Sequence, residues 1–546
     1  MRGDLGNPVA NFDIVIRNGM IYDGSGSAPF RGDIAIKSDI ISAMGSELDK
    51  GAMEIEATGL AVSPGFINML SWGVESLIED GRGQSDLRQG VTLEVFGEGE
   101  SMGPLSEEMK KELVKRQGDI KYEIRWTTLG EYLEYLVKRG VSPNVASFVG
   151  ATTVRIHALG YADRSASAKE LATMCELVRQ AMEQGAVGLG SSLIYAPASY
   201  APTEELIELA KVVARYDGMY ISHIRSEGSR LLEALDELEH IVREAGVRAE
   251  VYHFKAAGKS NWDKLDAAID KIEAARREGL HITADMYPYA GSETGLDAAM
   301  PRWVQEGGHD EWIKRLKDPS IRRRVEEEMS RPTDEWENMY LATGPEKMML
   351  AAFKSEKLKP LAGKTLAEVA AMWGKSAPQT AMDLVVQDDS RIGTIYFSMS
   401  DANVRRIAGL PWVSLGSDAE CVSPEGVFLK ILPHPRAYGT FARFLGKYVR
   451  DEKAATLEDA IRRLTSLPAG NLKLKLRGML KSGYYADIVV FDPARIRDHA
   501  TFDKPSQYST GVVHVLVNGI PTIKDGEHTN AKPGRVVRGP GWKGEN

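Results

Sequence analysis

The chain has 546 residues, of which 43% are hydrophobic and 27% are charged, and its formal net charge is −9. The length exceeds that of one small domain, and the composition is that of an ordinary globular protein with a large buried core. The acidic balance and the lack of a strong basic run argue against a nucleic-acid partner.

Both ends of the chain are predicted to form short β-strands. Residues 12–16, 33–36 and 40–43 have strand patterns, and Asn18-Gly19 marks a turn between two of the first strands. The C-terminal end repeats this pattern over 486–492 and 512–517. We expect one small β-sandwich domain built from residues 1–61 and 470–546, because hairpins from both ends would close each other's exposed edges.

The middle of the chain alternates apolar strand-length runs with amphipathic helical segments. Strand-like runs include 146–149, 188–191, 219–222, 250–253, 282–285 and 412–415, and helical patterns cover 168–184, 203–215, 228–245 and 261–278. Repeated strand and helix units predict a parallel sheet. Over residues 62–469 the best expectation is an α/β fold of the (β/α)₈ TIM-barrel type. A mostly helical segment at about 305–375 breaks the alternation and is predicted to be an insertion on the barrel, with a lid as one expected role.

Two histidines occupy matching places about one strand–helix unit apart. His223 ends the run in SHIRSEG, and His253 ends the run in YHFKAAGK. Polar residues at strand C-termini face the active site of a barrel, and neutral imidazoles bind Zn²⁺. A single histidine at such a place is more often a hydrogen-bonded structural residue. Two at equivalent places make a metal site about as good an explanation.

Two carboxylates follow the strand-like run that precedes Gly97. In FGEGESMGP, Glu98 and Glu100 lie among glycines, which let the backbone approach a ligand closely. By spacing alone a solvated surface turn is the slightly better explanation. Asp418, in GSDAE, ends a late strand and could act as a proton acceptor and donor in a hydrolytic metal site. Asp285 competes for that role and is ranked lower, as a structural carboxylate.

Several other classes of enzyme and location are disfavoured. The sequence has no Walker loop, no dinucleotide-binding glycine fingerprint, no Gly-x-Ser-x-Gly elbow and no His-Glu-x-x-His. Two cysteines, Cys175 and Cys421, do not form a disulfide framework, so a reducing cytoplasm is expected. Neither a signal-peptide core nor an apolar run of membrane-spanning length is present, and no membrane partner is expected. The sequence is compatible with a homo-oligomer as well as with a monomer.

Taken in order, the motifs resemble those of the amidohydrolase superfamily, and within it the N-acyl-D-amino-acid deacylases, or D-aminoacylases. The resemblance runs nearly end to end, through FDIVIRNGMIYDGSG, SPGFIN, RQGVT, SHIRSEG, HFKAAGK, DMYPYAGSETGLDAAMP, GSDAE, HPRAYGTFARFLG, LTSLPAGNL and GYYADIVVFDP. It implies a (β/α)₈ barrel with a small β-sandwich from both termini. It also implies a metal held by a cysteine and two histidines, and the two histidines carry over to His223 and His253.

The chain departs from the family at two places that concern the metal. The cysteine is absent, and alignment through Pro104-Leu105 puts Glu98 in its place, with Glu100 as the fallback. The family's Asp-x-His-x-His reads Asn68, Leu70 and Trp72, so the ligands of a second metal are lost. We expect one Zn²⁺ bound by Glu98, His223 and His253, with another divalent transition metal also compatible. Trp72 is expected to fill the space of the second ion.

The resemblance implies hydrolysis of a linear amide, with a small-molecule N-acyl-D-amino acid or related N-acyl compound as substrate and Asp418 as general base and acid. Its substrate-binding residues carry over to Lys255 and Tyr195, with Arg225, Ser292 and Arg436 as weaker candidates. Lys255 could equally be a structural lysine behind the site. Two alternatives remain: a D-aminopeptidase-like or cyclic amide or lactone hydrolase of the same superfamily, and a non-catalytic, metal-poor binding protein on the same scaffold.

Overall fold

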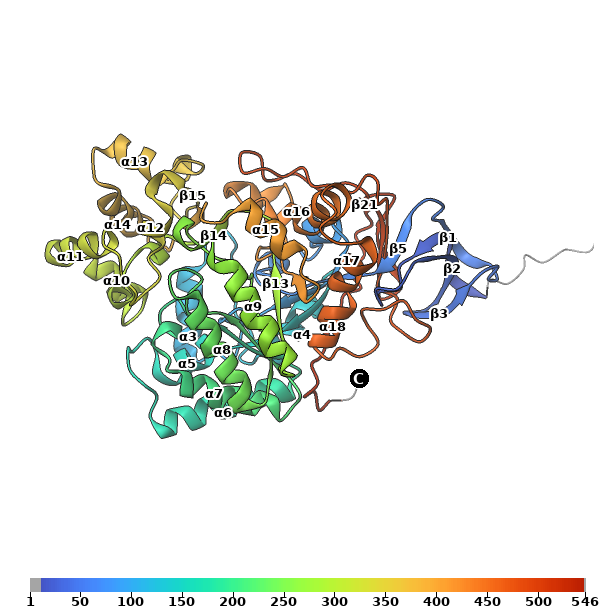
Figure 1. Ribbon diagram of the computed structural model, residues 1–546, viewed down its shortest axis with the longest axis horizontal. Coiled ribbons are helices and arrows are strands. Elements are labelled where there is room, and N and C mark those ends of the chain that lie inside the picture. The colour runs from blue at the N-terminus through green and yellow to red at the C-terminus, as the bar shows by residue number, and fades with distance from the viewer. Residues whose placement is uncertain (1–10, 545–546) are drawn as a thin grey trace, which may run out of the picture.

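The computed structural model describes residues 11–544, and Figure 1 labels its helices and strands. The first ten residues of the predicted segment 1–61 and the last two of 470–546 lie outside the described part of the chain. Three bodies follow one another along the long axis of the molecule (Figure 1). A sheet from both chain ends lies at one end, the barrel lies in the middle, and a helical layer lies at the other end.

The terminal domain joins strands from both ends of the chain in one mixed sheet. Its strand order is β21-β20-β19-β18-β5-β1-β2-β3, and β4 also pairs with β1. Its N-terminal strands are β1 (Phe12–Ile21), β2 (Phe30–Lys37), β3 (Ile40–Gly45), β4 (Gly51–Glu56) and β5 (Ala61–Pro64). Its C-terminal strands are β18 (Ile488–Phe491), β19 (Val512–Val517), β20 (Ile520–Lys524) and β21 (Glu527–His528). β18 runs antiparallel to β5, so the two ends of the chain meet in the middle of the sheet.

The central domain is the predicted (β/α)₈ barrel, and the fold class is confirmed. Its strands are β6 (Phe66–Asn68), β7 (Val91–Phe96), β8 (Asn144–Ser147) continued by β9 (Val149–Gly150), β10 (Gly188–Ser192), β11 (Met219–His223), β12 (Arg248–Val251), β13 (Ile282–Met286) and β17 (Val413–Leu415). Neighbouring strands pair in parallel. The barrel closes where the Met69 N–H donates to the Leu415 carbonyl at 3.0 Å and the Asp418 N–H donates to the Leu70 carbonyl at 2.9 Å.

Amphipathic helices cover the outside of the barrel because their apolar stripes need burial. They include α4 (Leu129–Arg139), α5 (Ala151–Leu159), α6 (Ala168–Glu183), α7 (Thr203–Ala214), α8 (Leu231–Ala245), α9 (Lys264–Arg277), α15 (Asp401–Ala408), α16 (Arg436–Arg443), α17 (Leu457–Leu464) and α18 (Ser466–Asn471). Short helices α1 (Ser76–Glu79), α2 (Gln84–Leu87) and α3 (Glu107–Arg116) lie in the first loops. The start of α6 is fixed by a capping box between Ser167 and Glu170.

The helical layer is inserted between β13 and β17 and has its own apolar core. It holds α10 (His309–Arg315), α11 (Pro319–Met329), α12 (Met339–Thr343), α13 (Leu366–Trp373) and α14 (Ala377–Asp388). A small sheet of β14 (Ser292–Gly295), β16 (Gly393–Tyr396) and β15 (Met348–Ala352) connects it to the barrel. The predicted insertion at 305–375 lies inside this longer segment.

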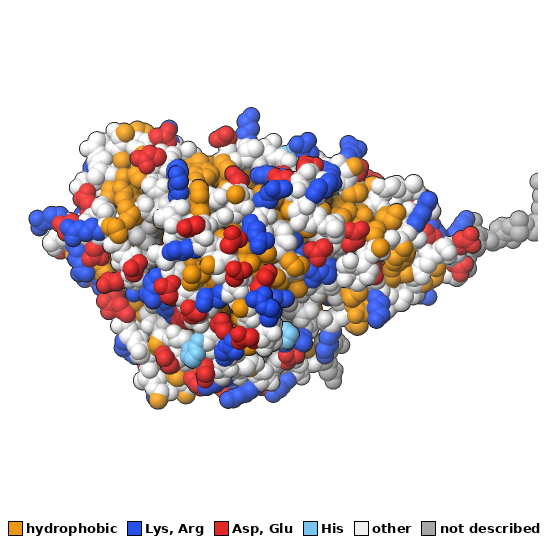
Figure 2. Space-filling model, viewed as in Figure 1, with side chains coloured by type: hydrophobic (Ala, Val, Ile, Leu, Met, Phe, Trp, Pro, Cys, Tyr) orange, Lys and Arg blue, Asp and Glu red, His pale blue; other side chains and the backbone are white. Residues whose placement is uncertain are grey.

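The outer surface carries mixed charge. Figure 2 shows Lys and Arg side chains interspersed with Asp and Glu over the face in view. Among residues 11–544, no helix is both long and apolar enough to cross a membrane.

Candidate metal centre

Two neighbouring barrel strands bring His223 and His253 together. His223 is the last residue of β11, and His253 follows β12 by two residues. Because β11 and β12 pair in parallel, with Ser222 opposite Val251, both side chains reach the C-terminal mouth of the barrel. Their ring centroids are 4.6 Å apart, and both rings are buried.

Glu98 completes the group from the loop after β7. Its Oε1 lies 3.1 Å from His223 Nδ1 and 2.9 Å from His253 Nε2. The loop can turn here because Gly97 and Gly99 both have positive φ, and a Cβ on Gly97 would meet the Phe148 carbonyl oxygen at 2.4 Å. Glu100, the fallback, is exposed and lies outside this group.

The donor set of these three residues fits a divalent transition metal. One atom each from Glu98, His223 and His253 lies within 4.8 Å of the others, and all three residues are buried. Two imidazole nitrogens and one carboxylate oxygen are ligands that Zn²⁺ accepts, and three protein ligands leave a coordination position free for a water or substrate. His223 Nε2 is buried and has no hydrogen-bond partner, which is an unusual state for an imidazole that only supports structure.

The charges of this group explain its protonation when no metal is bound. Burial and the Lys255 charge lower the pKa of His253, but the carboxylates of Glu227 and Glu98 outweigh them and raise it to about 10. Burial raises the pKa of Glu98, yet the charge on His253 and the hydrogen bonds from both histidines hold it well below its usual range. A metal bound here would replace a proton between these side chains.

Glu227 and Lys255 lie on the side of the histidine rings away from Glu98. Glu227 Oε1 lies 2.9 Å from His253 Nδ1, and its Oε2 lies 3.8 Å from His223 Nε2. Lys255 Nζ donates to Glu227 at 2.5 Å and lies 2.8 Å from His253 Nδ1. Lys255 is thus in contact with His253, a candidate metal ligand. Sequence reasoning did not single out Glu227, although its place four residues after His223 is a usable signal.

Asp418 lies at the mouth of the barrel beside this group. Its Oδ1 accepts a hydrogen bond from Trp72 Nε1 at 3.1 Å, and its Oδ2 lies 2.8 Å from Arg436 Nη1. Burial raises the pKa of Asp418 above its usual value, although Arg436 opposes the shift. Asp285, the competing candidate, lies deeper and accepts the backbone N–H of His253 at 2.8 Å.

The remaining predicted substrate residues differ in their distance from the group. The Tyr195 ring packs edge-on against His223, with centroids 5.3 Å apart. The Arg225 guanidinium is held by Glu237 and by the carbonyls of Ser199 and Ala201. Ser292 starts β14, and its hydroxyl donates to the Tyr396 carbonyl at 3.5 Å. The structure therefore brings Tyr195 into contact with His223, a candidate metal ligand, and holds Arg225 and Ser292 in other contacts.

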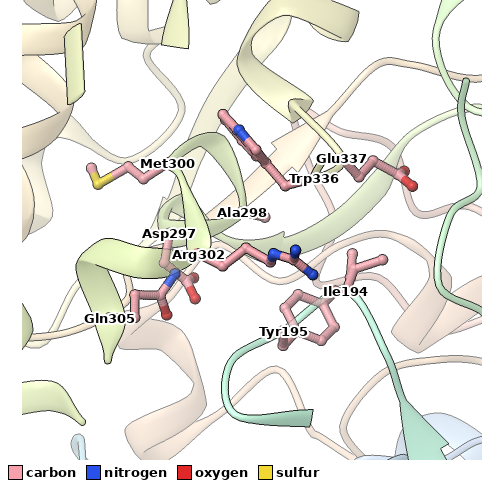
Figure 3. Close-up of a pocket in the computed structure, with 9 residues that line it drawn as sticks. All are labelled: Ile194, Tyr195, Asp297, Ala298, Met300, Arg302, Gln305, Trp336 and Glu337. Carbon is pink, nitrogen blue, oxygen red and sulfur yellow. The ribbon is translucent and has the colours of Figure 1, made fainter. Parts of the chain in front are cut away.

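A pocket opens between the loop after β10 and the inserted layer. Figure 3 shows the Arg302 side chain between Tyr195 and Ile194 on one side and Trp336 on the other, with the Glu337 carboxylate turned away from it. Glu337 also contacts the loop after β11, since its Oε2 accepts the backbone N–H of Glu227 at 2.7 Å. Sequence reasoning gave no signal for Glu337, which is 110 residues from Glu227.

A second buried acidic group lies in the barrel wall. Asp86, Glu94 and Cys421 each offer one atom within 4.8 Å of the others. Asn68 Nδ2 donates to Glu94 at 2.9 Å, and Ser85 Oγ donates to Asp86 at 2.9 Å. Burial raises the pKa of Glu94 to about 7 and that of Asp86 well above its usual value. Burial therefore favours the neutral, protonated form of these two side chains.

Comparison with known proteins gives consistent matches. Residues 53–523 match the model of the amidohydrolase family. A D-aminoacylase from Alcaligenes xylosoxydans xylosoxydans is 32% identical over 96% of this chain and 97% of its own. A crystal structure of N-acyl-D-glutamate deacylase from Bordetella bronchiseptica, complexed with zinc and a phosphonate mimic of the tetrahedral intermediate, is 30% identical, covers 96% of this chain and 99% of its own, and has a TM-score of 0.79.

The solved structure of a D-aminoacylase is a further match. It is 30% identical, covers 96% of this chain and 100% of its own, and has a TM-score of 0.80. It is described as having a binuclear metal centre with one-metal activation and second-metal attenuation.

Proposed function

The chain belongs to the amidohydrolase family, and from this premise we propose that it deacylates an N-acyl-D-amino acid or a related N-acyl compound, with one divalent metal ion per chain. It is a hydrolase that acts on carbon–nitrogen bonds other than peptide bonds. The observation that carries the proposal is the convergence of His223 Nδ1 and His253 Nε2 on Glu98 Oε1 at the barrel mouth.

Glu98, His223 and His253 would hold the metal, with Zn²⁺ as the first choice. A bound divalent ion supplies Lewis acidity for the amide carbonyl and makes a water molecule more acidic near neutral pH. Glu227 fixes the histidines from behind, since its carboxylate contacts His253 Nδ1 at 2.9 Å. Such contacts orient a ligand imidazole and raise its basicity.

Asp418 is the residue that we expect to move the proton. Its Oδ1 lies on the side of Trp72 and Glu98, and its Oδ2 is held by Arg436. It would take a proton from the attacking water and pass it to the departing nitrogen, because that nitrogen must be protonated in order to leave as an amine. The raised pKa of Asp418 suits a group that must both accept and release a proton.

The carboxylate of the substrate would be recognised by the buried cations around the group. Arg436 stacks over the Tyr287 ring at 4.6 Å, and its Nε is buried without a hydrogen-bond partner, so it has a donor to offer. Lys255 adds positive charge beside His253, and Tyr195 forms the neighbouring wall. Arg225 and Ser292 are proposed to act less directly, by supporting the loops that carry these groups.

The proposal is tested by metal analysis and a substrate panel on the purified chain. We expect one zinc per chain by elemental analysis, and release of the amine from N-acetyl-D-amino acids. The matched L-amides and cyclic amides test the stereochemistry and the type of amide bond. Absence of bound metal after incubation with Zn²⁺, Mn²⁺ or Co²⁺ would contradict the proposal and favour a binding protein. Turnover of cyclic amides alone would favour the other hydrolase class.

A further inference from the structure

We infer that the indole N–H of Trp72 takes the place of a second metal ion, positions Glu98 and Asp418, and limits the site to one ion. The inference rests on the proposed function, because it assumes that Glu98, His223 and His253 hold the first ion. It goes further by giving Trp72 a defined role and by predicting how the chain responds to excess metal.

The first observation is a shared hydrogen bond. Trp72 Nε1 donates to Glu98 Oε2 at 3.2 Å and to Asp418 Oδ1 at 3.1 Å. The other oxygen of each carboxylate is already engaged, Glu98 Oε1 by the two histidines and Asp418 Oδ2 by Arg436. One N–H therefore joins the carboxylate of a metal ligand to that of the proposed general base. A cation in this place would be held by Glu98 and Asp418.

The second observation is that the backbone fixes this arrangement. The Trp72 N–H donates to the Ala419 carbonyl at 2.9 Å, and the Asp418 N–H donates to the Leu70 carbonyl at 2.9 Å. Ser71 and Ala419 also form a parallel bridge. Asp418 has a φ of 50°, which residues with a side chain rarely adopt. The indole is thus attached to the strand extension that holds the bend at Asp418.

The third observation concerns space and the lack of other ligands. The Trp72 side chain packs on the apolar cluster that fills the barrel, which includes Leu70. Asn68 is turned to other partners, since its Nδ2 donates to Glu94 and Ser417. An ion between Glu98 and Asp418 would have to displace the indole, and neither Leu70 nor Trp72 could ligate it. The N–H gives the two carboxylates a neutral donor instead of a charge.

The consequence is a difference from the D-aminoacylase whose second metal is described as attenuating. If the indole closes that position, excess metal has no site from which to attenuate this chain. Metal titration of the unaltered protein tests this without any substitution. We expect equilibrium dialysis to give one zinc per chain even at a 50-fold molar excess, with turnover unchanged. Binding of two zinc ions per chain, or attenuation by the second equivalent, would overturn the inference.

The Trp72→Phe variant tests the positioning role, because it keeps an apolar ring and removes the N–H. We expect kcat to fall roughly 10- to 100-fold, since a hydrogen bond to a charged group is lost, while KM changes less than about threefold. The three ligands are untouched, so one zinc per chain should remain. At excess zinc the variant should still bind only one ion, because the phenyl ring keeps the space filled and adds no ligand.

Trp303→Phe is the matched control, because Trp303 Nε1 also donates to a carboxylate, that of Glu328, at 2.7 Å in the inserted layer. It should leave kcat and metal content unchanged. Equal kcat in the Trp72→Phe variant and the unaltered protein would overturn the positioning role. The zinc content of the unaltered protein distinguishes failure of the proposed function from failure of this inference. Absence of bound zinc would contradict the proposed function. One bound zinc, with the same turnover in the Trp72→Phe variant, would contradict only the inference about Trp72.

Discussion

His253 and Asp418 both have positive φ, 35° and 50°, which is costly for residues with a Cβ. Each bend is held by a hydrogen bond that its own backbone N–H donates, to Asp285 Oδ1 for His253 and to the Leu70 carbonyl for Asp418. Strained conformations of this kind cluster at functional sites, where the surrounding structure maintains them. The bends direct both side chains toward Glu98. Asp418 adopts one of these bends, whereas Asp285 supports the other, so we expect the two aspartates to have different roles.

Replacement of each aspartate by asparagine tests these roles. Asp418→Asn should lower kcat by roughly 10²- to 10⁴-fold, because the amide cannot accept the proton, and should leave the zinc content unchanged. Asp285→Asn should instead weaken zinc binding, by roughly 10- to 100-fold, since it loosens the bend that carries His253. Steady-state kinetics and competition with a chelator measure the two effects. An Asp285→Asn variant with the larger loss of kcat and unchanged zinc affinity would reverse the assignment.

The sequence predicts only part of this group, and the limit is physical. His223, His253 and Asp418 could be singled out because strand C-termini in a barrel converge, a rule that needs only the position of each strand. Glu98 needed the resemblance to a family, since a Glu between glycines is ordinary in a surface turn. The Trp72 hydrogen bond to Asp418 spans 346 residues, and no local pattern encodes the direction of an indole N–H.

At the scale of elements, helices with a strong start signal were predictable and long-range junctions were not. The helix predicted from residue 168 begins there because Ser167 and Glu170 form a capping box. The helix predicted from Gly228 begins at Leu231, because Ser226 Oγ accepts the N–H groups of Gly228 and Arg230 and holds them in a turn. The inserted layer was visible as a break in pattern, but its contact with Glu227 was not.

The contact between Glu337 and Glu227 predicts that the inserted layer affects metal binding by Glu98, His223 and His253. Glu337 Oε2 accepts the Glu227 N–H at 2.7 Å, and Glu227 in turn contacts His253 and Lys255. Glu337→Ala should lower zinc affinity or kcat/KM by roughly tenfold, because it frees the loop that holds the histidines. The neighbouring Glu335→Ala is the control, since Glu335 is exposed. Isothermal titration with zinc and steady-state kinetics give the comparison, and equal values for both variants would remove the inserted layer from the site.

At the scale of the whole molecule, the terminal sheet is fastened to the end of the barrel opposite the metal group. Asn144 starts β8, and its Oδ1 accepts from Asn518 Nδ2 at 2.8 Å across 374 residues. Asp487 accepts the Asn518 N–H at 2.8 Å and forms a buried ion pair with Arg477. The matching strand patterns at the two ends predicted a shared domain, whereas this polar junction depends on side chains that meet only after folding.

Because the junction lies at the N-terminal ends of the barrel strands, we expect it to govern stability and not turnover. Asp487→Ala would leave the Arg477 guanidinium buried without its carboxylate, which should lower the free energy of unfolding by roughly 3–5 kcal/mol. Asp503→Ala, at an exposed position of the same domain, should change it by less than about 0.5 kcal/mol. Urea unfolding followed by circular dichroism measures both, and kcat of the folded variants should match that of the unaltered chain. A stable Asp487→Ala variant with impaired turnover would mean that the junction acts on the site through the barrel strands, and that the two ends of the barrel are not separate in function.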